Sequence, residues 1–171
     1  MLFLDLPVGS SKDMPLSDYV FEFDTPLGCV TFTGADTGLS SVSFKEQGPK
    51  RPGSYAPLYM HQAKEQVLEY LHGHRTGFDI PLDYSGTRFQ LKVWQALREI
   101  RYGCTVSYGY IARRIGNPKA SRAVGGANNK NPLPLIIPCH RVIGHDGSLV
   151  GYGSGLWRKK WLLELEGICM T

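Results

Sequence analysis

Ile136-Ile137-Pro138-Cys139-His140-Arg141-Val142-Ile143 places one thiol between an apolar run and two basic side chains. Proline fixes the backbone angle φ and has no amide donor, so Pro138 is expected to end the apolar run from Leu133 to Ile137 and to present Cys139 at the end of a strand. Neighbouring histidine and arginine charges lower the pKa of a thiol, which raises the fraction of nucleophilic thiolate. The stretch therefore predicts an exposed, reactive Cys139.

The alternative for Cys139 is a buried and inert side chain, because most unpaired cysteines behave as small hydrophobic residues. The adjacent His140 does not decide between the two interpretations, since a nucleophile and its base have to meet in space rather than in sequence. Both remain open on the local sequence alone.

Composition excludes several classes of protein. The chain has 171 residues, enough to bury a core in one domain or in two small ones. Its cysteines lie far apart and form no CxxC or Cys/His ligand spacing: Cys29, Cys104, Cys139 and Cys169. This pattern argues against a structural zinc site and a secreted disulfide scaffold, so we expect no metal. Asp5 stands where a signal peptide would be basic, and no stretch approaches about 18 apolar residues, so we expect a soluble, cytoplasmic protein without a membrane partner, associated with the nucleoid if the source is bacterial.

The net charge of +4 hides an asymmetry between the two halves of the chain. Residues 1–84 hold 6 Lys and Arg against 11 Asp and Glu, whereas residues 85–171 hold 13 against 4. A basic half of this size is typical of a surface that meets phosphate groups. A solvated basic face without a partner is the alternative.

The N-terminal part predicts a small α/β lobe over residues 18–84, preceded by a flexible lead over residues 1–17. Three segments alternate or are rich in β-branched and aromatic residues, with turn sequences between them: 19–24, 28–33 and 39–44. We expect them to form an antiparallel sheet. A Gly, Pro and Lys loop covers 45–56, and a helix over 58–72 carries an apolar face made of Ala63, Val67, Leu68 and Leu71. Residues 78–82 predict a further strand or a linker.

Residues 85–171 predict a mainly helical domain, so the fold class is α+β. Apolar residues recur at three- and four-residue steps from Phe89 to Ile100, behind a Thr87 cap. A short helix capped by Ser107 follows, then a Gly-Asn-Pro turn and a second helix over 119–128, which together form a helix-turn-helix. The last expected element is an amphipathic helix over 157–166, with Trp161, Leu162 and Leu165 facing inward.

The second helix of this pair is built almost entirely from small residues: Ala120-Ser121-Arg122-Ala123-Val124-Gly125-Gly126-Ala127-Asn128. Two glycines cost a helix roughly 1 kcal/mol each relative to alanine, so helix propensity is given up for the close approach of another surface. That surface is either a neighbouring helix or a nucleic-acid groove. Major-groove readers usually carry several long polar side chains, and this helix has Arg122 alone, so we expect weak sequence specificity and contacts to the backbone or the minor groove.

Several motifs in one order closely resemble the O6-alkylguanine-DNA alkyltransferases. The motifs are Arg122 to Ala127, Asn131-Pro132, Pro138 to Val142, Gly151-Tyr152, and Lys159 to Gly167. The resemblance is dense from about Phe89 to Gly167 and looser over the N-terminal lobe, where the turn from Thr25 to Gly28 also fits.

The resemblance implies DNA repair by direct damage reversal, the activity of a methylated-DNA-protein-cysteine methyltransferase that acts once. An alkyl group, commonly methyl, would move from O6 of guanine in double-stranded DNA onto Cys139 after the base is flipped out of the duplex. It also implies a monomer that uses no small-molecule cofactor. The preferred alkyl group, activity on O4-alkylthymine and cooperativity on DNA stay open.

By the same resemblance, His140 and Glu166 match a relay that runs from carboxylate to imidazole to water to thiol, in which neutral histidine accepts the cysteine proton. Asn131 matches a hinge asparagine, and Tyr108 matches a phenol that helps to bind guanine and to protonate the departing base. Taken alone, Glu166 is a surface acid, Asn131 an ordinary turn residue and Tyr108 a half-buried aromatic. Arg141 is expected to be a structural donor that ties the turn together.

The resemblance also implies surfaces for DNA and for the extruded base. Arg122 matches the finger that fills the gap left by the flipped nucleotide. The rest of the DNA-binding set is Ser121, Ala123, Gly125, Gly126 and Asn128, and the pocket set is Tyr108, Val142, Tyr152, Gly153 and Ser154. Ser154 stands where glycine is common in the family, which puts the tolerance of bulky alkyl groups in question.

Two rival functions remain. A non-catalytic lesion-binding relative would flip the damaged base without repairing it, but such proteins carry tryptophan at the acceptor position, where this chain has Cys139. A cysteine hydrolase would need a third, orienting residue and an oxyanion hole, and it would not account for the basic, small-residue helix-turn-helix.

Overall fold

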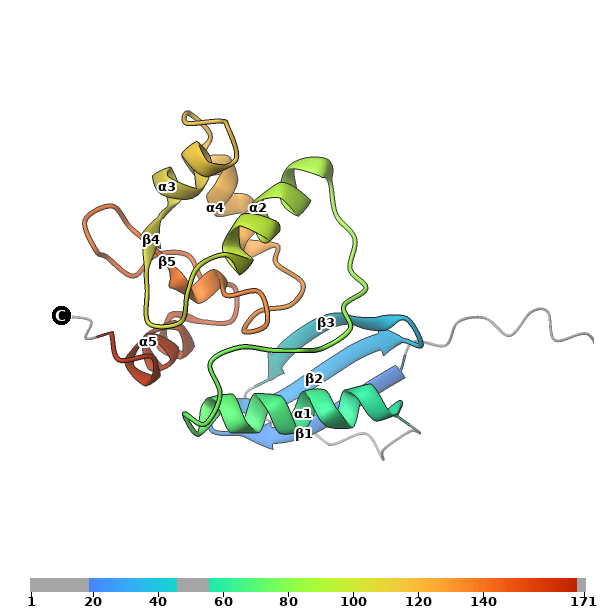
Figure 1. The fold of residues 1–171 in the computed structure, drawn as a ribbon. Helices are drawn as coiled ribbons and strands as arrows, with labels where there is room; N and C mark the ends of the chain where they lie inside the picture. The colour runs from blue at the N-terminus through green and yellow to red at the C-terminus, as the bar shows by residue number, and fades with distance from the viewer. Residues whose placement is uncertain (1–18, 46–55, 169–171) are drawn as a thin grey trace, which may run out of the picture.

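The computed structural model describes residues 19–45 and 56–168, which form a three-stranded sheet covered by one helix, with a group of further helices beside it (Figure 1). The expected lead over 1–17 and nearly all of the expected loop over 45–56 lie outside the described residues. The combination of a small antiparallel sheet and separate helices confirms the α+β class. Within the described ranges, none of the helices is both long enough and apolar enough to cross a membrane.

The sheet is an antiparallel meander, as the alternating segments predict. β1 (Tyr19–Thr25), β2 (Gly28–Ala35) and β3 (Gly38–Lys45) pair in the order β1-β2-β3. The turn between β1 and β2 requires Gly28, whose φ is +98° and where a Cβ would lie 2.5 Å from the carbonyl oxygen of Lys45.

α1 (Leu58–Leu71) lies across one face of the sheet (Figure 1). Its buried residues are Met60, Ala63, Val67, Tyr70 and Leu71. Leu68, which the apolar pattern assigns to this face, is half-buried instead. The buried side of α1 therefore includes a phenol, and its hydroxyl needs a hydrogen-bond partner in the interior.

Residues 78–82 are a linker rather than a strand. The linker meets β3 at a single bridge between Leu39 and Leu82, where Leu39 N donates to Pro81 O at 2.8 Å and Asp83 N donates to Leu39 O at 2.9 Å. A longer ladder does not form here because Pro81 has no amide donor. The bridge ties the edge of the sheet to the chain that enters the helical part.

α2 (Arg88–Arg98) begins at the expected cap. The Thr87 hydroxyl accepts from Gln90 N at 3.2 Å, and the Gln90 side chain accepts from Thr87 N at 2.8 Å, which is a capping box. Inside the helix, Trp94 is buried and its Nε1 donates to Ala127 O at 2.9 Å. This bond fixes α2 against the small-residue helix.

The helix-turn-helix forms as the sequence predicts. Ser107 caps α3 (Tyr108–Arg114) by accepting from Tyr110 N at 3.1 Å. The turn passes through Gly116 at a φ of +78° and leads to α4 (Ser121–Asn129). α3 and α4 pack against each other and against α2.

The apolar run from Leu133 to Ile137 is not a strand, contrary to the sequence prediction. It folds into a buried turn in which Ile137 N donates to Leu133 O at 2.8 Å and Leu135 has a φ of +79°. The Asn131 side chain supplies the partners that a ladder would provide, because Nδ2 donates to Ile137 O at 2.8 Å and Oδ1 accepts from Leu133 N at 3.0 Å. A short, uniformly apolar run fits a buried turn as well as a buried strand.

This turn leads directly into the segment that carries the thiol. Cys139–Arg141 form one turn of 3-10 helix, η1, and β5 (Val142–Ile143) then pairs in parallel with β4 (Val106–Ser107). The thiol therefore lies between a buried turn and a short strand whose first residue, Val142, is buried.

α5 (Leu156–Leu165) is the last described helix. Leu162 is buried as expected, whereas Trp161 and Leu165 are only partly buried. Arg158 and Lys159 are buried at 5% and 0% exposure, which no pattern of hydrophobic residues indicates. α5 thus brings two cations into the interior.

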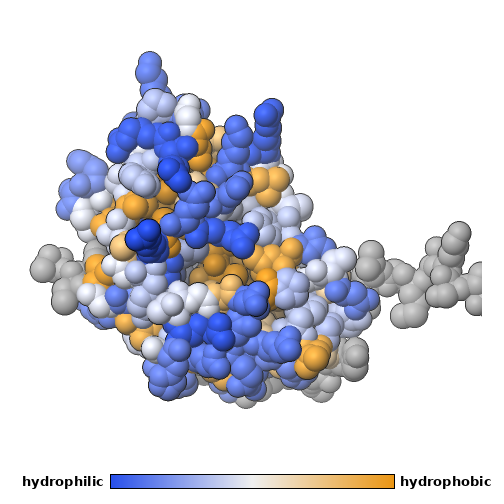
Figure 2. Space-filling view, in the orientation of Figure 1, coloured by the Kyte–Doolittle hydropathy of each residue, from blue (hydrophilic) through white to orange (hydrophobic). Residues whose placement is uncertain are grey.

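A groove of about 340 Å³ runs between the linker and the loop that follows α2. In the space-filling view, hydrophobic residues gather in a hollow between the sheet-containing part and the helical part, beneath hydrophilic side chains (Figure 2). Tyr102 and Arg141 are among the residues that line the groove. Behind them lies a cluster of buried polar side chains.

Candidate active site

Cys139 lies in the interior, with 3% exposure. Burial raises the pKa of its thiol to about 11, although a hydrogen bond with Asn131 and the charge of Lys159 act in the opposite direction. The prediction of an exposed thiol with a lowered pKa is therefore wrong, because desolvation of the sulfur outweighs the nearby positive charges. The resting thiol is protonated and becomes a nucleophile only when its proton is removed.

His140 is fully buried and its imidazole faces Glu166, with Nε2 and Oε1 2.7 Å apart. Burial lowers the pKa of His140 and outweighs the raising effect of Glu166, so the imidazole is neutral near pH 7. The proton of the neutral imidazole is on Nε2, where it is donated to the carboxylate. Nδ1 therefore carries the free lone pair. Nδ1 is buried and has no hydrogen-bond partner among the described residues, so it is available to accept a proton.

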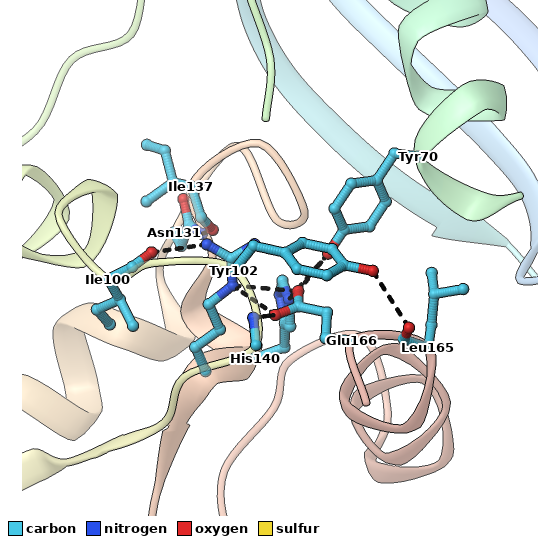
Figure 3. Close-up of polar contacts among 10 residues, drawn as sticks. Tyr70, Ile100, Tyr102, Asn131, Ile137, His140, Leu165 and Glu166 are labelled. Carbon is cyan, nitrogen blue, oxygen red and sulfur yellow. Dashed lines mark hydrogen bonds and ion pairs between the residues drawn. The ribbon is translucent and has the colours of Figure 1, made fainter. Parts of the chain in front are cut away.

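Glu166 follows the last turn of α5 and is the centre of the polar cluster (Figure 3). Arg141 Nε donates to both carboxylate oxygens, at 3.1 and 2.9 Å, and Gly103 N donates to Oε2 at 2.9 Å. Burial alone would raise the pKa of Glu166, but hydrogen bonds from His140, Arg141 and Tyr70 hold it at about 2. The carboxylate is therefore ionised at physiological pH and keeps the imidazole in one tautomer.

Tyr70 belongs to this cluster although it comes from α1 in the N-terminal part (Figure 3). Its hydroxyl donates to Glu166 Oε1 and lies 3.4 Å from His140 Nε2. Tyr70 does not stand out in the sequence as a site residue, because its position on the apolar face of α1 is that of an ordinary core residue. The one available signal was a phenol among aliphatic residues on a buried helix face.

Arg141 is a structural donor that ties the turn to its surroundings. Besides its two bonds to Glu166, its Nη1 donates to Ile100 O at 2.7 Å, at the end of α2, and its guanidinium lies over the Tyr102 ring, 5.7 Å from the centroid. Each of these contacts is made to the protein's own residues and holds the turn in place.

Asn128 is not on the DNA-facing surface that the resemblance implies for it. It is buried at 3% exposure, and its Nδ2 donates to the carbonyl oxygen of Cys139 at 3.3 Å. The side chain points inward because Asn128 shares the inner face of α4 with Val124 and Ala127. Asn128 and Asn131 therefore both hold the thiol segment by hydrogen bonds to its backbone.

Lys159 is a second residue that the sequence analysis missed as part of the site. Its Nζ donates to Val142 O at 2.6 Å and to Val150 O at 2.7 Å, so it joins the strand after the thiol to the loop that follows. Burial lowers the pKa of Lys159 to about 8, with Cys139 acting to raise it. Its position within the basic triplet Arg158-Lys159-Lys160 suggests a solvated helix face and hid its role.

Tyr108 begins α3 and reaches over to the loop after β5. Its hydroxyl donates to Val150 O at 3.0 Å and lies 3.3 Å from Gly151 O. Burial raises the pKa of Tyr108, and Cys139 acts in the same direction. A Cβ at Gly125 of α4 would lie 3.8 Å from the Tyr108 ring, so this ring lies between α4 and the loop.

The other residues of the expected pocket set occupy different depths. Val142 and Tyr152 are buried, Ser154 is half-buried and Gly153 is exposed. Burial raises the pKa of Tyr152, and Cys139 acts in the same direction. The pocket set therefore includes surface as well as interior positions. Across the described ranges, no group of three or more His, Cys, Asp or Glu side chains is arranged to hold a metal ion.

The expected DNA-binding set, apart from Asn128, is accessible on α4. Arg122, Ala123 and Gly126 are exposed, and Ser121 and Gly125 are half-buried. A Cβ added at Gly126 would meet no described atom within 4 Å. Neither glycine is therefore required for packing inside the protein, which favours an external surface over a neighbouring helix as the reason for the small residues.

A buried thiol, a neutral histidine oriented by an ionised carboxylate, and a basic helix-turn-helix beside them define a DNA-binding protein with a cysteine nucleophile. The model of the family described as 6-O-methylguanine DNA methyltransferase, DNA binding domain, matches residues 88–168.

Curated relatives match most of the chain. A methylated-DNA–protein-cysteine methyltransferase of Methanosarcina acetivorans is 48% identical over 88% of this chain and 99% of the relative. One from Mycolicibacterium paratuberculosis is 49% identical over 84% of this chain and 88% of the relative. A crystal structure of Mycobacterium tuberculosis OGT in complex with DNA has a TM-score of 0.79 at 46% identity, over 86% of this chain and 92% of that one. The chain belongs to the methylated-DNA–protein-cysteine methyltransferase family, which confirms the resemblance.

Proposed function

We propose that this protein repairs double-stranded DNA by moving an alkyl group from O6 of guanine to Sγ of Cys139. The observation that carries the proposal is the contact of 2.7 Å between His140 and Glu166, which leaves Nδ1 of His140 as a buried proton acceptor beside the thiol segment. Membership of the family supports the same reaction.

Proton removal from Cys139 is the first requirement. A thiol with a pKa of about 11 is ionised in on the order of one molecule in ten thousand at pH 7, so the ground state alone supplies little nucleophile. We assign the acceptor role to His140 Nδ1, reached from Sγ through one water molecule, with Glu166 stabilising the imidazolium that forms. The charge of Lys159 stabilises the resulting thiolate.

The transfer itself exchanges one bond for another. The thiolate attacks the alkyl carbon, the Sγ–C bond forms, and the C–O6 bond breaks, with its electron pair going to the guanine. Tyr108 is the proposed proton donor to the departing base, because its hydroxyl lies on the loop at Val150 and Gly151, next to the expected pocket residues. The proton that His140 took from Cys139 is returned to Tyr108 through solvent, so the reaction neither releases nor consumes a proton. The products are unmodified guanine and an S-alkylcysteine, and the reaction ends there because no step removes the alkyl group from sulfur.

The depth of Cys139 requires the base to leave the duplex. A sulfur with 3% exposure cannot reach a base that is still stacked in DNA, so the damaged nucleotide has to be rotated into the pocket. Arg122, exposed on α4, is the proposed finger that occupies the vacated position. The small residues around it allow α4 to approach a groove closely.

The experiment uses duplex DNA with a single O6-methylguanine labelled in the methyl group. We expect the label on Cys139 and unmodified guanine in the DNA. Retention of labelled DNA without transfer would favour the lesion-binding rival, and absence of both would favour the hydrolase. Cys139→Ala is the control that separates transfer to this sulfur from transfer to any other cysteine.

A further inference from the structure

One buried contact connects the N-terminal part to the proposed relay. The hydroxyl of Tyr70, on α1, donates to Glu166 Oε1 and lies 3.4 Å from His140 Nε2. We infer that Tyr70 is a positioning residue for the relay: its hydroxyl holds the carboxylate of Glu166 and thereby limits the basicity of His140. The inference deepens the proposed function and rests on it.

The hydroxyl of Tyr70 has its hydrogen-bond partners in the relay. Tyr70 is 0% exposed, so its O–H is removed from water and needs a partner inside the protein. Among the described residues these partners are Glu166 and His140. Phenylalanine would fill the same space without this requirement, so packing alone does not account for a tyrosine at this position.

The ring of Tyr70 is held firmly enough to position another side chain. It packs against Phe78 of the linker, with the ring centroids 5.0 Å apart, and against the edge of Tyr102 at 5.9 Å. α1 fixes its backbone against the sheet. The hydroxyl therefore approaches Glu166 from a rigid element, which is what a positioning residue requires.

Oxygen Oε1 of Glu166 accepts from both Tyr70 and His140, and Oε2 accepts from Gly103 N. Arg141 Nε donates to both oxygens. Tyr70 and His140 thus share one carboxylate oxygen. A hydrogen bond from Tyr70 withdraws negative charge from Oε1, which weakens its attraction for a protonated His140. Removal of the hydroxyl should therefore strengthen that attraction and raise the pKa of His140.

Other charged and titratable groups face His140 and Glu166 from the neighbouring elements. They are Tyr102 from the loop before β4, Cys139 and Arg141 from η1, and Lys159 from α5. The positive charges of Arg141 and Lys159 lower the pKa of His140, and Glu166 raises it. None of these groups changes in a Tyr70→Phe variant, so a shift in that variant reports the missing hydroxyl.

Tyr102 provides a matched control. It lies beside Tyr70 and close to Glu166, but its hydroxyl donates to the backbone carbonyl of Leu165 at 3.2 Å rather than to the relay (Figure 3). Tyr102→Phe removes an oxygen of the same kind from the same neighbourhood and leaves the hydrogen bonds of Glu166 unchanged.

The test measures the single-turnover rate of methyl transfer from O6-methylguanine duplex DNA against pH, for the full chain and for both variants. The rate falls in acid when His140 becomes protonated, so the midpoint of this fall reports its pKa. We expect Tyr70→Phe to move the midpoint to higher pH by about half a unit to one unit, and Tyr102→Phe to leave it in place. An unchanged midpoint in Tyr70→Phe, with a rate lowered equally at every pH, would overturn the inference and assign Tyr70 to packing.

A second measurement separates this inference from the proposed function. The titration of the His140 imidazole, followed by NMR in the folded protein without DNA, should show the same upward shift in Tyr70→Phe and none in Tyr102→Phe. Wild-type protein that leaves the methyl group on DNA would contradict the proposed function, while the NMR titration would still decide the role of Tyr70. An imidazole that titrates identically in all three proteins would contradict the inference itself.

Discussion

The sheet with α1 and the segment from Asn131 to Arg141 are both buried, but they are held together in different ways. The first is stabilised by apolar packing, such as the edge-on contact of Phe23 with Phe32, whose centroids are 5.0 Å apart. The second is held by hydrogen bonds from side chains: Asn131 to the backbone of its own turn, and Arg141 to Glu166 and Ile100.

The difference shows how one fold serves stability and chemistry in separate places. Apolar packing tolerates substitution by residues of similar volume, whereas a buried polar network depends on each donor and acceptor. The polar segment also contains His140 Nδ1, a buried acceptor without a hydrogen-bond partner among the described residues. Buried polar atoms usually have a hydrogen-bond partner. A buried nitrogen without one, in the residue next to a thiol, therefore indicates the reactive part of the molecule.

Cys139→Ala should have the largest effect on the reaction and little effect on the fold. Alanine fills part of the same buried space, so the fold and the affinity for lesion-containing DNA should stay within about threefold of wild type, while transfer disappears. Gel-shift titration and the methyl-transfer assay measure the two properties. Loss of both together would mean that the sulfur supports the turn rather than the reaction.

Glu166→Gln should have the next largest effect. Glutamine cannot stabilise an imidazolium as a carboxylate does, so the transfer rate should fall by about 100-fold or more. The variant also leaves Arg141 without its charged partner, which should cost about 3 to 5 kcal/mol of unfolding free energy. Glu164→Gln on the exposed side of α5 is the matched control, and it should transfer methyl at the wild-type rate.

The same variant tests the acid stability of the wild-type protein. Glu166 has a folded-state pKa of about 2 against an ordinary value of 4.5, so it contributes stability above pH 4.5 that is lost as the pH falls toward 2. The contribution is on the order of 3 kcal/mol. Urea unfolding at several pH values should show this loss in the wild type, and Glu166→Gln should lack the part that Glu166 provides. A wild-type curve that stays flat below pH 4.5 would argue against an ionised, hydrogen-bonded carboxylate.

Arg122→Ala addresses the DNA-facing surface rather than the relay. Removal of the one long side chain on the outer face of α4 should weaken binding to lesion-containing duplex by about 1 to 3 kcal/mol. The rate of repair of a single-stranded substrate should decrease less, because a single strand has no vacated base-pair position for Arg122 to occupy. Lys64→Ala, which removes an equal charge from α1, is the control. Unchanged repair of duplex DNA in Arg122→Ala would eliminate the finger role.

Gly126→Ala should have the smallest effect, and it should change protein stability and DNA affinity in opposite directions. A Cβ at this position meets no described atom within 4 Å, and alanine favours a helix over glycine, so the protein should gain about 0.5 to 1 kcal/mol of stability. The affinity for DNA should nevertheless decrease, because the added methyl group keeps α4 away from the groove. Thermal unfolding and gel-shift titration measure the two effects. A variant that gains stability and binds DNA as tightly as wild type would show that the glycine does not serve DNA contact.

Much of the fold could be predicted from the sequence because it follows local rules. Strand alternation indicated the meander, Thr87 and Ser107 marked the starts of α2 and α3, and glycine turns separated the helices. These signals depend on neighbours in the chain, so they are visible without tertiary structure.

The site was predictable only where a motif carried it. The resemblance pointed to His140 and Glu166, which the structure places 2.7 Å apart. Tyr70 and Lys159 were missed because their roles depend on contacts distant in sequence or hidden in a basic helix. The raised pKa of Cys139 was missed for a related reason, since sequence neighbours show charge but not burial.

Mass spectrometry of the protein after incubation with excess O6-methylguanine duplex tests the central claim most directly. We expect one methyl group for each protein molecule, located on the peptide that contains Cys139, with an equal amount of guanine restored in the DNA. An unmodified Cys139, or a methyl group on Cys29 or Cys104 instead, would contradict it.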